Sequence, residues 1–228
     1  MTTYAATSPS AQGRRIPWKL YVAVAIADGL IVGIPLAMLG WTASALILTA
    51  RYTARFSFLW FLMVFVSRPL ATIWPGPATR WMLRRQRHLG LTFAMAHFIH
   101  LGALAEFLRV SGGPANPVTV IVGGFGYFVL ALMAATSNDA SVRILGANWK
   151  RIHRFGMYYL LFVFVATYLT RFTVRKPPEP LGIYVLLLTL AVCAVGLRVA
   201  AMRSRRARGG ALPRRGNQAL AAAGSRER

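Results

Sequence analysis

The chain contains four histidines, and their type and spacing make them the residues most able to carry chemistry. They are His88, His97, His100 and His153. All of them lie in or at the edge of two apolar segments, residues 89–108 and 155–172. A polar side chain inside a bilayer is costly unless it is paired, coordinated or solvated. Two membrane helices that present histidines to each other favour a haem held between axial imidazoles, an arrangement that moves electrons.

The composition indicates a membrane protein with several spans. The chain has 228 residues, of which 56% are hydrophobic, and its mean hydropathy is +0.50. This balance is too apolar for an ordinary soluble domain. The net charge of +22 does not indicate nucleic acid, because the cations lie between apolar runs and in the tail. Cys193 is the only cysteine, which excludes a disulfide within the chain and a thiolate redox pair.

Six segments are long enough to cross about 30 Å of hydrocarbon at about 1.5 Å per residue. The expected spans are residues 21–40, 56–74, 89–108, 117–136, 155–172 and 181–200. For residues 41–55 three interpretations stay open: they extend the first helix, they lie on the membrane surface, or both. We therefore expect an all-α membrane protein, a six-transmembrane-helix bundle. Its parts are an N-terminal segment 1–19, a membrane domain 20–202 and a basic, disordered tail 203–228.

The Lys and Arg residues predict the orientation. They concentrate in the N-terminal segment, in the connections after the second and fourth spans, and in the tail. The positive-inside rule then places both termini in the cytoplasm, in a bacterial inner membrane whose anionic lipid attracts the tail. No glycine-rich loop lies between a strand and a helix, so the chain has no flavin or nicotinamide domain. A partner must therefore supply the electrons.

The positions of the histidines favour one pair. His88 and His153 both lie at the cytoplasmic edge of parallel spans, at the matching depth that ligation by two histidines requires. His100 lies about 18 Å further along the third span than His88 and about 120° around its axis. The fifth span offers it only residues 165–168, none of which is a good haem ligand. His97 is one turn from His100 on the same helix, so these two cannot sandwich one ring.

Each histidine also has a structural interpretation. A single histidine at a membrane edge, such as His88 or His153, is more often an interfacial residue than a ligand. His97 in isolation would more often bond a backbone carbonyl or a hydroxyl. His100, near the middle of the membrane, is the hardest to explain without a function. The residues alone leave haem binding and a structural role about equally open.

Several local strings carry a resemblance to a known family. Residues 84–91 (RRQRHLGL), followed by His100, resemble the third-helix signature of the ferric reductase-like transmembrane superfamily. In that signature, basic residues lead into Leu-Gly-Leu and a haem-ligating histidine follows. Residues 67–70, 131–137 and 149–153 resemble the MsrQ (YedZ) branch. Its members are haem-bearing membrane subunits that pass electrons to a periplasmic methionine sulfoxide reductase. The resemblance covers roughly residues 20–200.

By this resemblance, His100 and His153 would be associated with haem iron. The family has a further histidine on the fifth span, where this chain has Ala166 or Thr167, so one expected axial ligand is missing. Three outcomes stay open. One haem lies between His88 and His153, or one haem binds through His100 with a water, His153 or an open position opposite, or no haem binds.

We expect a single b-type haem, with His153 and His100 ranked first as ligands, then His88, and His97 last. FMN and quinone are further cofactor candidates. The expected function is a transmembrane electron carrier, the electron-transfer subunit of an oxidoreductase system with no catalytic residue of its own. Its donor would be a cytoplasmic flavin reductase or a quinol. Its acceptor would be periplasmic, such as a methionine sulfoxide reductase or ferric iron.

Two rival functions belong to other classes. The first is a haem-free membrane scaffold or assembly subunit that retains the bundle, and the missing histidine of the fifth span supports it. The second is a small transporter. The few carboxylates in the spans and the lack of paired broken helices count against a transporter.

Overall fold

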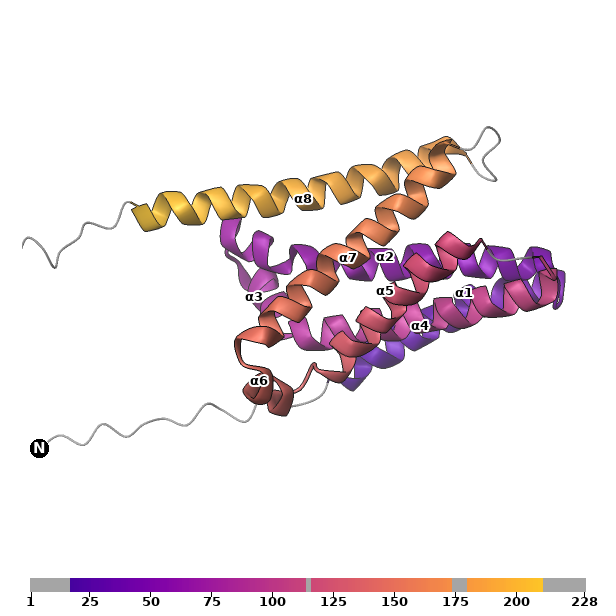
Figure 1. The fold of residues 1–228 in the computed structure, drawn as a ribbon, viewed down its shortest axis with the longest axis horizontal. Coiled ribbons are helices and arrows are strands. Elements are labelled where there is room, and N and C mark those ends of the chain that lie inside the picture. Colours follow the sequence, from indigo (N-terminus) through magenta and orange to yellow (C-terminus); the bar gives the residue numbers. More distant parts are fainter. Residues whose placement is uncertain (1–16, 114–115, 174–179, 211–228) are drawn as a thin grey trace, which may run out of the picture.

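The computed structural model describes residues 17–113, 116–173 and 180–210, and this part of the chain is helical with short connections (Figure 1). The elements are α1 Trp18–Leu39, α2 Ala43–Ile73, α3 Pro77–Arg84, α4 Gln86–Ser111, α5 Pro117–Ala135, α6 Asp139–Leu145, α7 Ala147–Thr173 and α8 Leu181–Gly210. Six of these helices are long and apolar enough to cross a membrane. The expected all-α bundle of six membrane helices is therefore confirmed.

Residues 41–55 do not extend the first helix. The first helix ends at Leu39, and Gly40 turns the chain with a φ of 65°. Thr42 then caps the second helix, because its Oγ1 accepts a 3.2 Å hydrogen bond from the Ala45 N–H. Residues 43–55 are therefore the first turns of α2, which begins earlier than the sequence predicts.

The expected ends of the membrane domain also need revision. The last helix continues to Gly210, so residues 203–210 are helical although we expected them in the disordered tail. Most of the expected N-terminal segment, residues 1–16, and the rest of the tail, residues 211–228, lie outside the described residues.

Individual residues mark where α4 ends and where α5 begins. Gly112 ends α4 in the left-handed conformation, with a φ of 62°. Asn116 then begins α5, and its Oδ1 accepts hydrogen bonds from the Val118 and Thr119 N–H groups at 2.9 and 3.3 Å. Pro117 occupies the first helical position, where it lacks only a donor that the helix does not use.

The core is built on α2, which packs against α1, α3, α4 and α8. Phe61 of α2 lies 5.5 Å from Phe93 of α4 and 5.4 Å from Phe164 of α7, measured between ring centroids. Membrane helices associate through such close packing, because lipid tails already solvate apolar side chains. The aromatic cluster therefore joins α2, α4 and α7 at the middle of the bundle.

Figure 1 shows the consequence for the shape of the bundle. The α8 helix runs along one side, where it packs on α2 and α7, and α1 lies on the other side against α2 and α4. Successive long helices alternate in direction, so α3, α6 and the C-terminal part of α8 gather at one end. We call this the basic end, after Arg84, Arg87, Lys150, Arg154 and Arg205.

Candidate functional site

A cavity of about 690 Å³ opens at the basic end. Its volume falls within the range of small-molecule and cofactor sites. The walls come from α2, α4, α5, α7 and α8, together with Val142 of α6. Among the described residues that line it, His153 is the single histidine. Its apolar wall includes Phe93, Leu130, Met133 and Met157.

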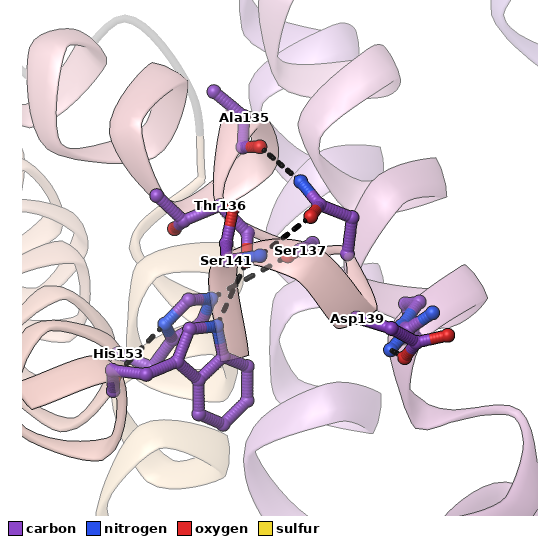
Figure 2. A network of polar contacts seen from close by, with 9 residues as sticks. Ala135, Thr136, Ser137, Asp139, Ser141 and His153 are labelled. Atoms are coloured by element: carbon purple, nitrogen blue, oxygen red, sulfur yellow. Dashed lines mark hydrogen bonds and ion pairs between the residues drawn. The ribbon is translucent and has the colours of Figure 1, made fainter. Parts of the chain in front are cut away.

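His153 is held by its neighbours on α7 and α5. Its Nδ1 lies 3.1 Å from the Trp149 carbonyl oxygen, and the two rings stack with centroids 4.0 Å apart. The Nε2 atom lies 3.4 Å from the Oγ of Ser137 (Figure 2). The Trp149 Nε1–H donates in turn to the Thr136 carbonyl at 2.8 Å, so the start of α7 is fixed to the end of α5.

In one of the two neutral tautomers of His153, the two ring nitrogens have different roles. An Nδ1–H that donates to a backbone carbonyl leaves the lone pair on Nε2, which is how histidine ligands of metals are oriented. The 3.4 Å contact to Ser137 is at the long end of hydrogen-bond geometry, so a better partner can replace it. His153 can therefore serve as a ligand at the cavity wall.

The cavity is strongly cationic. The positively charged residues in its wall are Arg68, Arg87, Lys150, Arg154, Arg198 and Arg205, and the wall has no Asp or Glu among its described residues. Lys150 and Arg154 flank His153 on α7, and the Arg198 guanidinium lies 4.0 Å from the Phe65 ring centroid. Such a wall suits a ligand with an apolar body and anionic groups.

One acid lies close to this wall, on the short helix α6. Arg87 forms an ion pair with Asp139, whose side chain is largely exposed. The hydrogen bond and charge of Arg87 lower the pKa of the Asp139 carboxyl below its usual value of 3.8. This pair joins the start of α4 to α6, and Asp139 itself lies outside the membrane-spanning helices.

His97 and His100 lie elsewhere, in the interior of the bundle. His97 is only 8% exposed, and its Nδ1 lies 2.9 Å from the Ser57 Oγ of α2. Its ring packs on Tyr127 of α5 at 4.9 Å between centroids. The Nδ1 of His100 lies 3.3 Å from the Thr53 Oγ1, also of α2. Both histidines therefore tie α4 to α2.

His88 does not line the cavity. Its Nδ1 lies 3.0 Å from the Tyr21 hydroxyl, so it ties α4 to α1. The structure thus does not bring His88 and His153 together, although the sequence places them at the same depth. Nor does it join His100 to His153, because His100 does not line the cavity. His100 lies about 9 Å further along α4 than Ala94, the last described residue of α4 that does.

The sequence does not identify the residues that contact the histidines. Thr49, Thr53 and Ser57 recur every fourth residue of α2, a polar stripe that could have marked the face toward His97. No sequence pattern indicates that Trp149 and Ser137 contact His153, because these contacts depend on how α5, α6 and α7 meet.

The described residues contain no group of three or more His, Cys, Asp or Glu able to hold a metal ion. A site with several side-chain ligands is thus not present in this part of the chain. A haem iron does not need such a group, because the porphyrin supplies four nitrogen ligands and the protein supplies only one or two. No protein-family model matches the chain, and no solved structure matches it.

Proposed function

We propose that this protein is a transmembrane electron carrier that holds a single b-type haem in the cavity beside His153. One observation carries the proposal. The only histidine among the described cavity-lining residues is oriented through Nδ1, and cations surround the same cavity. Haem would match such a cavity, because its iron binds an imidazole, its ring is apolar and its two propionates are anionic.

The residues present fit such a group. His153 would ligate the iron, Lys150 and Arg154 would hold the propionates, and Phe93, Leu130 and Met133 would enclose the apolar ring. A bound b-type haem supplies one-electron redox chemistry. The residues do not fit a ring held between two histidines, because His88, His97 and His100 bond hydroxyl groups outside this cavity.

Two features of the site would influence the binding and the redox potential of the haem. Trp149 fixes the imidazole by stacking and through its carbonyl oxygen, so the ligand is preorganised. The cations of the wall outnumber the one acid that pairs with them, Asp139, so they would stabilise anionic groups and favour the more negative redox state of a bound centre. The carrier would accept electrons from a cytoplasmic flavin reductase or a quinol and deliver them to a periplasmic reductase or ferric iron.

A reduced-minus-oxidised spectrum of the purified chain in detergent tests this function, with a pyridine haemochrome assay for stoichiometry. We expect a haem spectrum that changes on reduction and about one haem per chain, because His153 is proposed to hold one haem in one cavity. The absence of haem after expression with an ample haem supply would contradict the proposal.

A second candidate, a haem-free membrane scaffold, is favoured by a different observation. His88, His97 and His100 each link α4 to a neighbouring helix through a hydroxyl group, which accounts for three histidines without any cofactor. A scaffold predicts that the purified chain is colourless and that all four histidines affect stability alone. Haem content therefore separates the two functions.

A further inference from the structure

A second cavity, of about 410 Å³, lies at the basic end between α2, α3 and α8. The residues that line it are Arg68, Ala71, Thr72, Leu83, Gln86 and Arg205. Arg68 and Thr72 are one turn apart on α2, whereas Arg205 comes from α8. Two guanidinium groups from distant parts of the sequence are thus brought to one small opening.

Neutral oxygens hold both guanidinium groups. The Nε of Arg68 donates to the Gln86 Oε1 at 3.1 Å. The Nη2 and Nε of Arg205 donate to the Thr72 Oγ1 at 2.7 and 3.2 Å. Each guanidinium carries five N–H donors, so these bonds orient the groups and leave further donors for a ligand.

The charge of this pair is not balanced within its cavity. Among the described residues that line it there is no Asp or Glu, and the whole chain has 27 Lys and Arg against 5 acids. Two like charges that line one cavity repel each other, at a cost that an anion bound there would remove. The site therefore has the charge, the donors and the space for an anionic group.

We propose that Arg68 and Arg205 bind the phosphate of an anionic phospholipid at the basic end of the bundle. Guanidinium groups bind phosphate through paired, charge-assisted hydrogen bonds. Both residues lie near the ends of membrane-spanning helices, at the level where lipid headgroups lie, and basic residues there attract anionic lipid. Ala71 and Leu83 provide the apolar surface that the upper part of an acyl chain would contact.

A lipid at this position would also join two helices. Arg205 and Thr72 already connect α8 to α2, and a shared phosphate would add a second connection through Arg68. The proposed lipid would thus stabilise the position of α8, which forms one wall of the larger cavity. The two cavities share Arg68, Thr72, Gln86 and Arg205. The inference still does not depend on haem, because the residues proposed to hold haem, His153, Lys150 and Arg154, take no part in it.

Native mass spectrometry of the full chain in detergent tests the site, with phosphatidylglycerol added as the probe. The test variant is R68Q/R205Q, and the matched control is R84Q/R203Q, which removes two exposed cations that line neither cavity. We expect the test variant to retain phosphatidylglycerol about tenfold less than the parent, and the control to retain it like the parent.

Two further ligands and a second variant complete the experiment. Phosphatidylcholine should bind much less, and inorganic phosphate should not displace the bound lipid. If R68Q/R205Q does not fold, R68K/R205K keeps both charges and should weaken retention by removing the paired geometry alone. Equal loss in the control, equal binding of phosphatidylcholine, or unchanged retention in both test variants would overturn the proposal. Displacement by inorganic phosphate would assign the site to a soluble phosphate instead.

Discussion

The Nδ1 of His97 on α4 lies 2.9 Å from the Oγ of Ser57 on α2, inside the aromatic cluster of the bundle. The imidazole also packs on Phe164 of α7, with 5.2 Å between ring centroids. The histidine that the sequence ranks last as a ligand is thus the one most enclosed by three helices. Its hydrogen bond should therefore contribute to stability rather than to electron transfer.

Replacing Ser57 by Ala tests this role. The change leaves a buried imidazole nitrogen without its partner, so we expect the free energy of unfolding to fall by about 1–3 kcal/mol. The measurement is unfolding in mixed detergent micelles. Ser67→Ala is the matched control, because Ser67 is as buried on the same helix but bonds only the Met63 carbonyl. An equal loss in both variants would show that the His97 contact adds nothing.

Asp28 of α1 is a buried acid with an unusual environment. It is 1% exposed, and neither of its carboxyl oxygens has a hydrogen-bond partner among the described residues. Burial of such a group is costly, so Asp28→Leu should raise the free energy of unfolding by about 1–3 kcal/mol. The same micelle assay measures it, with Thr49→Val as a comparison at another unpaired buried oxygen. A less stable Asp28→Leu variant would show instead that the carboxyl group has a partner or ligand.

Gly156 sets the approach of α7 to α5 beside the cavity. A Cβ at this position would overlap the Met133 Sδ and lie 3.0 Å from the Val129 Cγ1. Gly156→Val should therefore destabilise the bundle by about 1–3 kcal/mol through overpacking. Gly196→Val of α8 is the control, because a Cβ there meets nothing within 4 Å. Thermal unfolding compares them, and two equal melting temperatures would contradict this account of the α5–α7 contact.

The Arg87–Asp139 pair predicts a dependence on pH. Because Arg87 lowers the pKa of Asp139 in the folded state, the pair contributes stability above the usual pKa of 3.8. That contribution is lost as the pH falls through the lowered value. The melting temperature of Asp139→Asn should be slightly below that of the parent at neutral pH, and the two should converge in acid. Since the pair is exposed, salt should also reduce the difference. A difference that does not change with pH would exclude this role.

The sequence predicts the membrane helices well, because each needs a long apolar run that composition alone reveals. It misplaces the start of α2, since Arg51 and Arg55 interrupt the hydropathy although Thr42 caps one continuous helix. The direction of a side chain around its helix is harder to predict. The sequence predicts one depth for His88 and His153, but in the structure they have different neighbours, the Tyr21 hydroxyl and the Ser137 hydroxyl. Such contacts depend on tertiary packing, which no local pattern contains.

The haem content of two single variants, measured by the pyridine haemochrome assay, tests the central proposal most directly. His153→Ala and His100→Ala each remove one imidazole from a membrane helix, but only His153 lines the large cavity. The proposal predicts that His153→Ala loses most of its haem, whereas folded His100→Ala keeps the stoichiometry and reduced spectrum of the parent. Full haem content in His153→Ala, or its loss in His100→Ala alone, would contradict it.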